Sequence, residues 1–128
     1  MPSTCAGTFV PYRYERVLES GKGKGLSIRI VIVDDHASLR QSVCSLLRQE
    51  SDMEVVAEAE NGSEALDRVV ALNPDVVLMD VRMPGMDGVE ATAAIRYSHP
   101  EVKVIALSVH ADPSFVKGMI DAGASGYV

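Results

Sequence analysis

From residue 28 onward, the spacing of hydrophobic residues changes repeatedly between the pattern of a β-strand and that of an α-helix. Ile28–Val33 reads IRIVIV, a nearly continuous β-branched run that is typical of a strand covered on both faces. Leucine and valine then recur at helical spacing and predict a helix over about 37–50. Similar reasoning predicts four more strands, at 53–60, 75–80, 102–108 and 126–128. The chain therefore reads as strands that alternate with helices.

Polar residues mark the ends of the remaining helices. Asn61–Glu64 and Asp87–Glu90 have the spacing of capping boxes, and each opens a helix. The first of these helices is expected to stop at Asn73-Pro74 and the second at His99-Pro100. Asp112 followed by Pro113 predicts a third start, because proline fits the first helical position. Gly123 suits the C-terminal cap of that helix.

This alternation predicts a parallel sheet with helices wound on both faces, an α/β fold. One common version has the strand order 2-1-3-4-5, in which strands 1 and 3 are neighbours. Ligands in such folds bind in the crevice at the carboxyl ends of the strands. The residues that follow strands 1 and 3 are therefore the first candidates for a functional site.

Composition and charge limit the class of protein. The chain has 128 residues, 47% hydrophobic and 23% charged, which suits one soluble globular domain. Its net charge of −6 argues against direct binding to nucleic acid. No apolar run approaches the roughly 18 residues that span a membrane, and no secretory signal is evident. Cys5 and Cys44 show no disulfide framework or metal spacing, so we expect a cytoplasmic protein. Residues 1–27 contain the stretch GKGKG at 21–25 and read as a flexible leader before a domain at 28–128.

Three carboxylates are expected at one crevice mouth. Asp34 and Asp35 end strand 1, and Asp80 ends strand 3. Acids placed together repel one another and raise their pKa values unless a cation neutralises them. A hard divalent ion with oxygen ligands, Mg²⁺ above all, would resolve this repulsion. The alternative is that these acids cap the following helices and face water.

Five stretches in register carry a resemblance to a known family. They read IVIVDDHASLRQSV, ENGSEAL, PDVVLMDVRMPGMDG, VKVIALSVHADPSFV and AGASGYV. Together they resemble the receiver domains of bacterial two-component response regulators, and most of all those of the LuxR/NarL type. The resemblance covers about Ile28 to Val128 and implies a flavodoxin-like (CheY-like) doubly wound sheet with the order 2-1-3-4-5.

The resemblance also implies a role for each matching residue. Asp80 would accept a phosphoryl group from a sensor histidine kinase, and the change would control an output such as transcription through a separate DNA-binding domain. Ser108 matches the hydroxyl that moves toward the phosphoryl group, and Tyr127 matches the aromatic switch residue. The implied Mg²⁺ ligands are Asp34, Asp35, Asp80 and the backbone carbonyl of Arg82. The side chains of Arg82 and His110 occupy positions that tune dephosphorylation in such domains, or are exposed loop residues without a role.

The sequence departs from the family pattern at its C-terminal end. In the family a lysine follows the Gly-Tyr-Val segment by two residues, and its position falls past Val128. We therefore expect an incomplete fifth strand and no helix after it, which would leave apolar strand surface uncovered. Three explanations stay open: a fragment of a longer regulator, a homodimer that covers the gap, or the leader around Tyr14–Leu18 docking there.

Three functions compete. The first is a phosphorylatable signalling module, which is not an enzyme beyond assisting its own phosphorylation and dephosphorylation. The second is a degenerate receiver that serves as an interaction or dimerisation module. The third is a phosphatase of the haloacid dehalogenase type, which usually needs an aspartate two residues after the nucleophile; Arg82 stands there instead.

Overall fold

The computed structural model describes residues 27–107 and 113–128. Predictions for residues 1–26 and for Ser108, His110 and Asp112 lie outside these residues. The described elements, in chain order, are β1 (Ile28–Val33), α2 (Ala37–Arg48), β2 (Met53–Ala59), α3 (Gly62–Leu72), β3 (Val76–Asp80), α4 (Gly88–Ser98), β4 (Lys103–Leu107), α5 (Pro113–Asp121) and β5 (Gly126–Tyr127). Each lies within one or two residues of its predicted bounds where both are described. Of the helices in this part of the chain, not one combines the length and the apolar character needed to cross a membrane.

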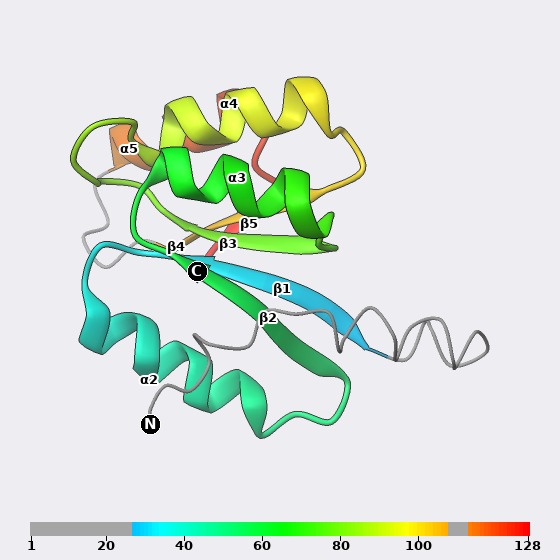
Figure 1. The fold of residues 1–128 in the computed structure, drawn as a ribbon. Coiled ribbons are helices and arrows are strands. Elements are labelled where there is room, and N and C mark those ends of the chain that lie inside the picture. Colours follow the sequence, from blue (N-terminus) through cyan, green and yellow to red (C-terminus); the bar gives the residue numbers. More distant parts are fainter. Residues whose placement is uncertain (1–26, 108–112) are drawn as a thin grey trace.

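The five strands form one parallel sheet in the order β2-β1-β3-β4-β5, as predicted (Figure 1). β1 pairs with β3 in a register that sets Ile30 beside Val76 and Val33 beside Met79. The ends of β1 and β3 therefore lie at the same edge of the sheet. β5 contains two residues, and no helix follows it in the described residues, as the sequence led us to expect.

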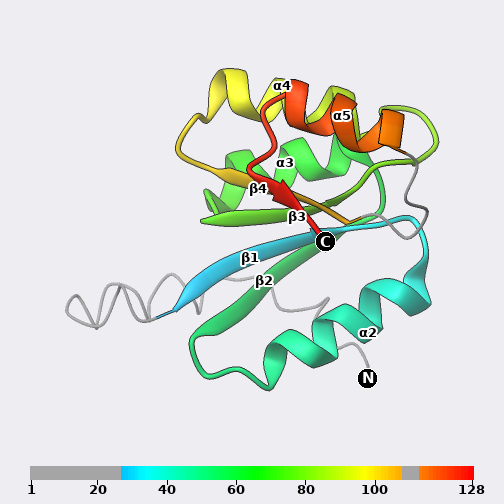
Figure 2. The same cartoon turned by 180° about the vertical axis from the view of Figure 1, so that it is seen from behind.

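The helices cover the two faces of the sheet unequally. α3, α4 and α5 lie over one face, and α2 lies over the other (Figures 1 and 2). Strand side chains alternate accordingly. Val31 and Val33 belong to the large core under α3, α4 and α5, whereas Ile30 and Ile32 pack with Cys44 of α2 in a smaller core.

The smaller core is also less complete. Val77 and Met79 of β3 are fully buried in the large core, whereas Val76 and Leu78 on the opposite face are only partly buried. On β4, Ile105 and Leu107 are likewise partly buried, and they alternate with the fully buried core residues of that strand. The α2 face thus retains partly accessible apolar surface over β3 and β4.

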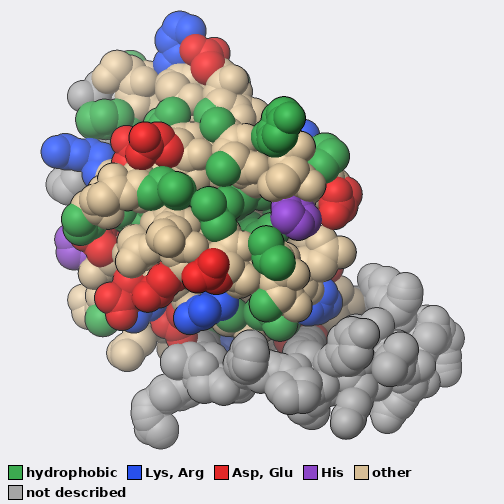
Figure 3. All heavy atoms as spheres, turned by 45° about the horizontal axis from the view of Figure 1, so that its top comes forward, with side chains coloured by type: hydrophobic (Ala, Val, Ile, Leu, Met, Phe, Trp, Pro, Cys, Tyr) green, Lys and Arg blue, Asp and Glu red, His purple; other side chains and the backbone are tan. Residues whose placement is uncertain are grey.

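The opposite face carries isolated exposed apolar side chains. Val70 of α3 is 70% exposed and Tyr97 of α4 is 91% exposed. Figure 3 shows hydrophobic side chains on this side of the molecule lying between acidic and basic ones. Single exposed apolar residues of this kind are normal on protein surfaces.

The helix ends follow the sequence with one shift. The capping box of α4 is complete: Asp87 Oδ1 accepts from the N–H of Glu90, and Glu90 Oε1 accepts from the N–H of Asp87. At α3, Asn61 accepts from the N–H of Glu64 as predicted, at 2.9 Å. The Glu64 carboxylate, however, accepts from the N–H of Glu60 rather than from that of Asn61. Only half of the predicted box is therefore formed at α3.

Candidate functional site

The carboxylates predicted to converge do lie together. Ligand atoms of Asp34, Asp35, His36 and Asp80 all fall within 4.8 Å of one another, at the carboxyl ends of β1 and β3. Asp34 is 1% exposed and Asp80 is 9% exposed, whereas Asp35 and His36 are exposed. The cluster therefore has a buried floor and a solvent-facing rim. It forms because β1 and β3 are neighbours in the sheet, although they are distant in the sequence.

The backbone and one carboxylate oxygen of Asp34 are hydrogen-bonded, whereas the other carboxylate oxygen has no partner among the described residues. Its N–H donates to the carbonyl of Ala59 at 3.1 Å, and its own carbonyl accepts from Arg40 Nη1 at 2.7 Å. Its Oδ1 accepts from the backbone N–H of His36 at 2.8 Å. Its Oδ2 is buried without a hydrogen-bond partner among the described residues. A buried carboxylate oxygen without a partner is costly, and a cation at this point would remove that cost. The oxygen-rich donor set fits Mg²⁺.

Asp80 has a perturbed acidity that reflects its surroundings. Burial, and then the negative charge of Asp34, raise the pKa of Asp80 from 3.8 to about 6. The backbone N–H groups of Arg82 and Val81 act in the opposite direction and lower its pKa. Asp80 is therefore largely ionised at neutral pH, and a neighbouring cation would favour this ionised form further.

His36 belongs to the cluster, which the sequence analysis did not anticipate. Its Nδ1 lies 3.1 Å from Asp34 Oδ1 and 3.2 Å from Asp35 Oδ1. The hydrogen bond to Asp34 and the charge of Asp35 raise the pKa of His36, although its side chain is 69% exposed. Its place directly after the two aspartates was the available signal. Nitrogen suits Mg²⁺ less well than oxygen, so His36 fits a place beside such an ion rather than on it.

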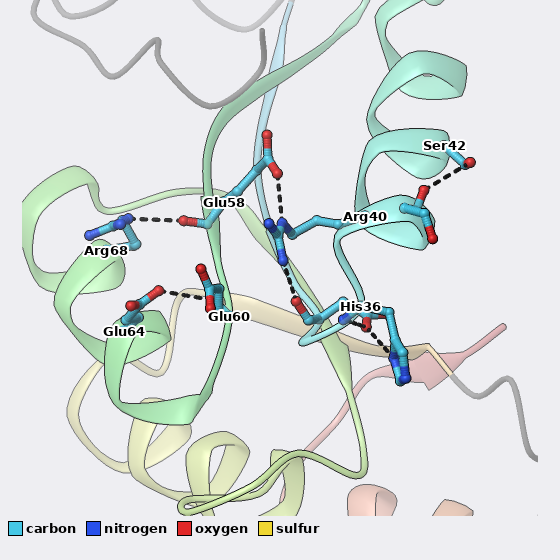
Figure 4. Close-up of polar contacts among 9 residues, drawn as sticks. His36, Arg40, Ser42, Glu58, Glu60, Glu64 and Arg68 are labelled. Atoms are coloured by element: carbon cyan, nitrogen blue, oxygen red, sulfur yellow. Dashed lines mark hydrogen bonds and ion pairs between the residues drawn. The ribbon is translucent and has the colours of Figure 1, made fainter. Parts of the chain in front are cut away.

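Behind the cluster lies the ion pair of Arg40 and Glu58, which the sequence did not predict. Arg40 Nε is 2.7 Å from Glu58 Oε1, and the two side chains are 12% and 9% exposed. Figure 4 shows the Arg40 side chain reaching from α2 between Glu58 on β2 and the loop that carries His36. The carbonyl of Glu58 accepts a further hydrogen bond from Arg68 of α3, at 3.0 Å. Sequence spacing gives no sign of this pair, because its members come from a helix and a strand that meet only in the fold.

The loop after Asp80 follows a tight path into α4. The N–H of Gly88 donates to the carbonyl of Val81 at 2.9 Å. A Cβ at Gly88 would stand 2.8 Å from Val81 Cα and would also overlap the Asp80 carbonyl. The glycine is therefore required for the helix to start against the strand end.

A pocket of about 360 Å³ lies beside this loop. It is lined by Val81, Arg82, Met83, Pro84, Asp87 and Phe115. The Arg82 guanidinium lies over the Phe115 ring of α5, so the side chain two residues after Asp80 is turned toward α5.

Three further site residues were predicted from the sequence: Tyr127, Ser108 and Arg82. Tyr127 is 60% exposed on β5, and its role as a switch stays a prediction. Ser108 lies outside the described residues. The backbone of Arg82 adjoins Asp80, and the use of its carbonyl as a metal ligand also stays a prediction.

Comparison with known proteins identifies the family. The model of the response regulator receiver domain matches residues 30–128. The chain belongs to the response regulator receiver domain family. It is 48% identical over 101 residues to the transcriptional regulatory protein DegU of Brevibacillus brevis, a match that covers 79% of this chain and 43% of DegU. It is 43% identical over 101 residues to the response regulator GacA of Pseudomonas viridiflava, covering 79% of this chain and 47% of GacA.

Solved structures agree with this receiver fold. A DNA-binding response regulator of the LuxR family from Staphylococcus aureus superimposes with a TM-score of 0.74 at 33% identity, over 79% of this chain and 84% of that one. The resemblance to LuxR/NarL-type receivers and the CheY-like topology are thus confirmed. The receiver spans less than half the length of the curated relatives DegU and GacA.

Proposed function

We propose that this receiver accepts a phosphoryl group on Asp80 from a sensor histidine kinase, with Mg²⁺ held by the acidic cluster. The observation that supports this most directly is the convergence of Asp34, Asp35 and Asp80 at the ends of two neighbouring strands. The buried Oδ2 of Asp34, which has no hydrogen-bond partner among the described residues, and the raised pKa of Asp80 are both features that a bound cation would relieve. Membership of the receiver family makes phosphoryl transfer the natural use of such a site.

The reaction needs a carboxylate nucleophile in a fixed place. An oxygen of the ionised Asp80 attacks phosphorus, the bond from phosphorus to the imidazole nitrogen of the donor breaks, and imidazole leaves. Bound Mg²⁺ supplies cancellation of charge on the phosphoryl oxygens. Asp34 and Asp35 would hold the ion, together with Asp80 and the Arg82 carbonyl. The backbone N–H groups of Val81 and Arg82 orient Asp80 and favour its ionised form.

The phosphorylated aspartate would then act as a switch. It concentrates charge and hydrogen-bond acceptors at one strand end, which can draw in Ser108 and change the rotamer of Tyr127. We propose that this change controls an output domain, in line with the DNA-binding relative described above.

The receiver domain itself is acidic, so we propose that it does not bind DNA directly. A cytoplasmic location follows from a role in regulating transcription. A homodimer through the partly covered α2 face is a further proposal.

The test uses acetyl phosphate as a small phosphoryl donor. We expect the wild-type chain with Mg²⁺ to gain the mass of one phosphoryl group, in an acid-labile form. Asp80→Asn should gain none, and excess EDTA should abolish the gain in wild type. Asp67→Asn, which makes the same change on an exposed position of α3, should behave as wild type.

Two outcomes would contradict the proposal. Failure of the wild-type chain to gain a phosphoryl group would favour a degenerate receiver that works as an interaction module. A gain that survives Asp80→Asn would move the acceptor to another residue. The expected result, gain of a phosphoryl group that depends on Asp80 and on Mg²⁺, would support a phosphorylatable signalling module.

A further inference from the structure

The Arg40 side chain joins three parts of the fold behind the acidic cluster. It extends from the first turn of α2, and its Nε donates to Glu58 Oε1 of β2 at 2.7 Å. Its Nη1 donates to the backbone carbonyl of Asp34 at 2.7 Å. Its side chain is 12% exposed and that of Glu58 is 9% exposed. Two short charged hydrogen bonds with little access to water make a rigid connection.

This connection fixes the backbone that carries two of the cluster carboxylates. The N–H of Asp34 is held by Ala59 of β2, and its carbonyl is held by Arg40. The peptide that links Asp34 to Asp35 is therefore fixed through the Asp34 carbonyl. Without Arg40, that carbonyl would lose its partner and the peptide could turn. The directions of both carboxylates depend on this peptide.

Glu58 is itself fixed from the other side of the strand. Its carbonyl accepts from Arg68 Nε of α3 at 3.0 Å, and its carboxylate accepts from Arg40. Figure 4 shows Arg68 and Arg40 approaching β2 from different helices. The guanidinium is thus oriented by a carboxylate that is 9% exposed and that extends from a strand residue whose backbone is also held by α3.

We propose that Arg40 is a positioning residue for the divalent cation site, and that it acts by holding the Asp34 carbonyl while Glu58 orients its guanidinium. The inference rests on the proposed function, because it assumes that the acidic cluster binds Mg²⁺. Groups that orient metal ligands without touching the metal typically change metal affinity by about 10–100-fold when removed.

Two simpler explanations predict different results. If Arg40 acted only through its charge, removing it would relieve repulsion of the cation and tighten binding. If the Arg40–Glu58 pair only stabilised the fold, replacing both members by apolar residues would leave cation affinity unchanged, since such replacements often fold well. A positioning role predicts weaker cation binding both when Arg40 alone is replaced and when Arg40 and Glu58 are replaced together.

The experiment measures Mn²⁺ binding to the full 128-residue chain by electron paramagnetic resonance, with Mg²⁺ as the competitor. We expect Arg40→Met to raise the Kd for Mg²⁺ by about 10-fold or more. The double variant Arg40→Met with Glu58→Met should show a similar increase, although its net charge equals that of wild type. The matched control is Arg48→Met, which removes the same charge about two turns farther along α2 and should bind as wild type.

Each result has a defined meaning. An unchanged or lower Kd in Arg40→Met would overturn the proposal, and so would recovery of wild-type affinity in the double variant. Circular dichroism and thermal unfolding in EDTA identify any variant that fails to fold, and the double variant keeps the test open if Arg40→Met alone does not fold. Failure of wild type itself to bind Mg²⁺ would contradict the proposed function and the inference with it. Normal wild-type binding with an unaffected double variant would contradict the inference alone.

Discussion

The guanidinium of Arg82 lies 5.2 Å from the centroid of the Phe115 ring. This contact joins the loop after Asp80 to α5, beside the pocket that both residues line. A cation–π contact at such a partly exposed place is worth about 0.5–1 kcal/mol. It therefore favours the conformer of Arg82 that faces α5 by a modest margin, which a substitution can remove without unfolding the domain.

We predict that Phe115→Leu changes the lifetime of the phosphorylated state. Release from the ring lets Arg82 reach the phosphoryl oxygens and shield them from water, so dephosphorylation should slow by about 2–5-fold, the factor equivalent to the cation–π energy. Loss of phosphate measured over time from purified phosphoprotein gives the rate. Phe115→Tyr should behave as wild type. In an Arg82→Gln background, Phe115→Leu should have no effect, and an equal effect there would show that Arg82 is not involved.

We predict that Asp80→Asn stabilises the domain at alkaline pH in EDTA. Folding raises the pKa of Asp80 from 3.8 to about 6, so the folded chain binds this proton more tightly than the unfolded chain does. That contribution to stability is complete below about pH 4 and is lost as pH rises through about 6. At pH 8, Asp80→Asn should raise the free energy of unfolding on the order of 1–3 kcal/mol. Urea unfolding at pH 4 and pH 8 measures this.

The same experiment includes its own checks. Asp67→Asn, an exposed acid on α3, should leave the stability at both pH values close to wild type. Adding Mg²⁺ at pH 8 should stabilise wild type more than Asp80→Asn, because the variant lacks the carboxylate whose charge the cation neutralises. Equal stability of wild type and Asp80→Asn at pH 8 in EDTA would contradict the raised pKa.

We predict that Gly88→Ala displaces the loop between β3 and α4. The new methyl group would stand 2.8 Å from Val81 Cα and would overlap the Asp80 backbone, which cannot move without disturbing β3. The expected loss of stability is on the order of 2 kcal/mol or more, with slower phosphorylation. Gly126→Ala provides the control, because a Cβ there meets nothing within 4 Å. Equal unfolding midpoints for the two variants would show that the loop adapts.

We predict that Asp87→Ala weakens α4 more than Asp67→Ala weakens α3. Asp87 is the N-cap of a complete capping box, whereas Asp67 lies in a helix interior facing solvent. Loss of the cap should cost about 1 kcal/mol in urea unfolding. Asp87→Asn should retain most of the stability, because its side-chain oxygen still accepts from Glu90. A smaller loss in Asp87→Ala than in Asp67→Ala would contradict this role.

The sequence predicts the sheet and the acidic cluster because both depend on local signals. The β-branched run ending at Val33 marks β1, and acids at Asp34 and Asp80 follow strands whose order is common in such folds. Strand order then brings the acids together without any knowledge of side chains. The same reasoning finds the N-caps, since Asn61 and Asp87 act within three residues.

The sequence does not predict contacts that depend on side-chain reach across elements. Arg40 and Glu58 meet because α2 packs on β2, and neither residue differs in pattern from an ordinary surface charge. The ring of His36 turns toward the aspartates, although the same position could have capped α2. The Glu64 carboxylate accepts from the N–H of Glu60 and not from that of Asn61, which the capping-box spacing alone does not indicate.

The pairing of β1 with β3 also sets an order of events during synthesis. Asp34 leaves the ribosome well before Asp80, and β2 and α3 are made between them. At elongation rates of about 5–20 residues per second, the interval lasts roughly 2–10 seconds. Throughout that time the nascent chain holds the β1 aspartates without the strand that completes the cluster. The acidic cluster is thus complete only once β1 and β3 have paired, so a stalled or truncated chain that ends before β3 would hold Asp34 and Asp35 without Asp80.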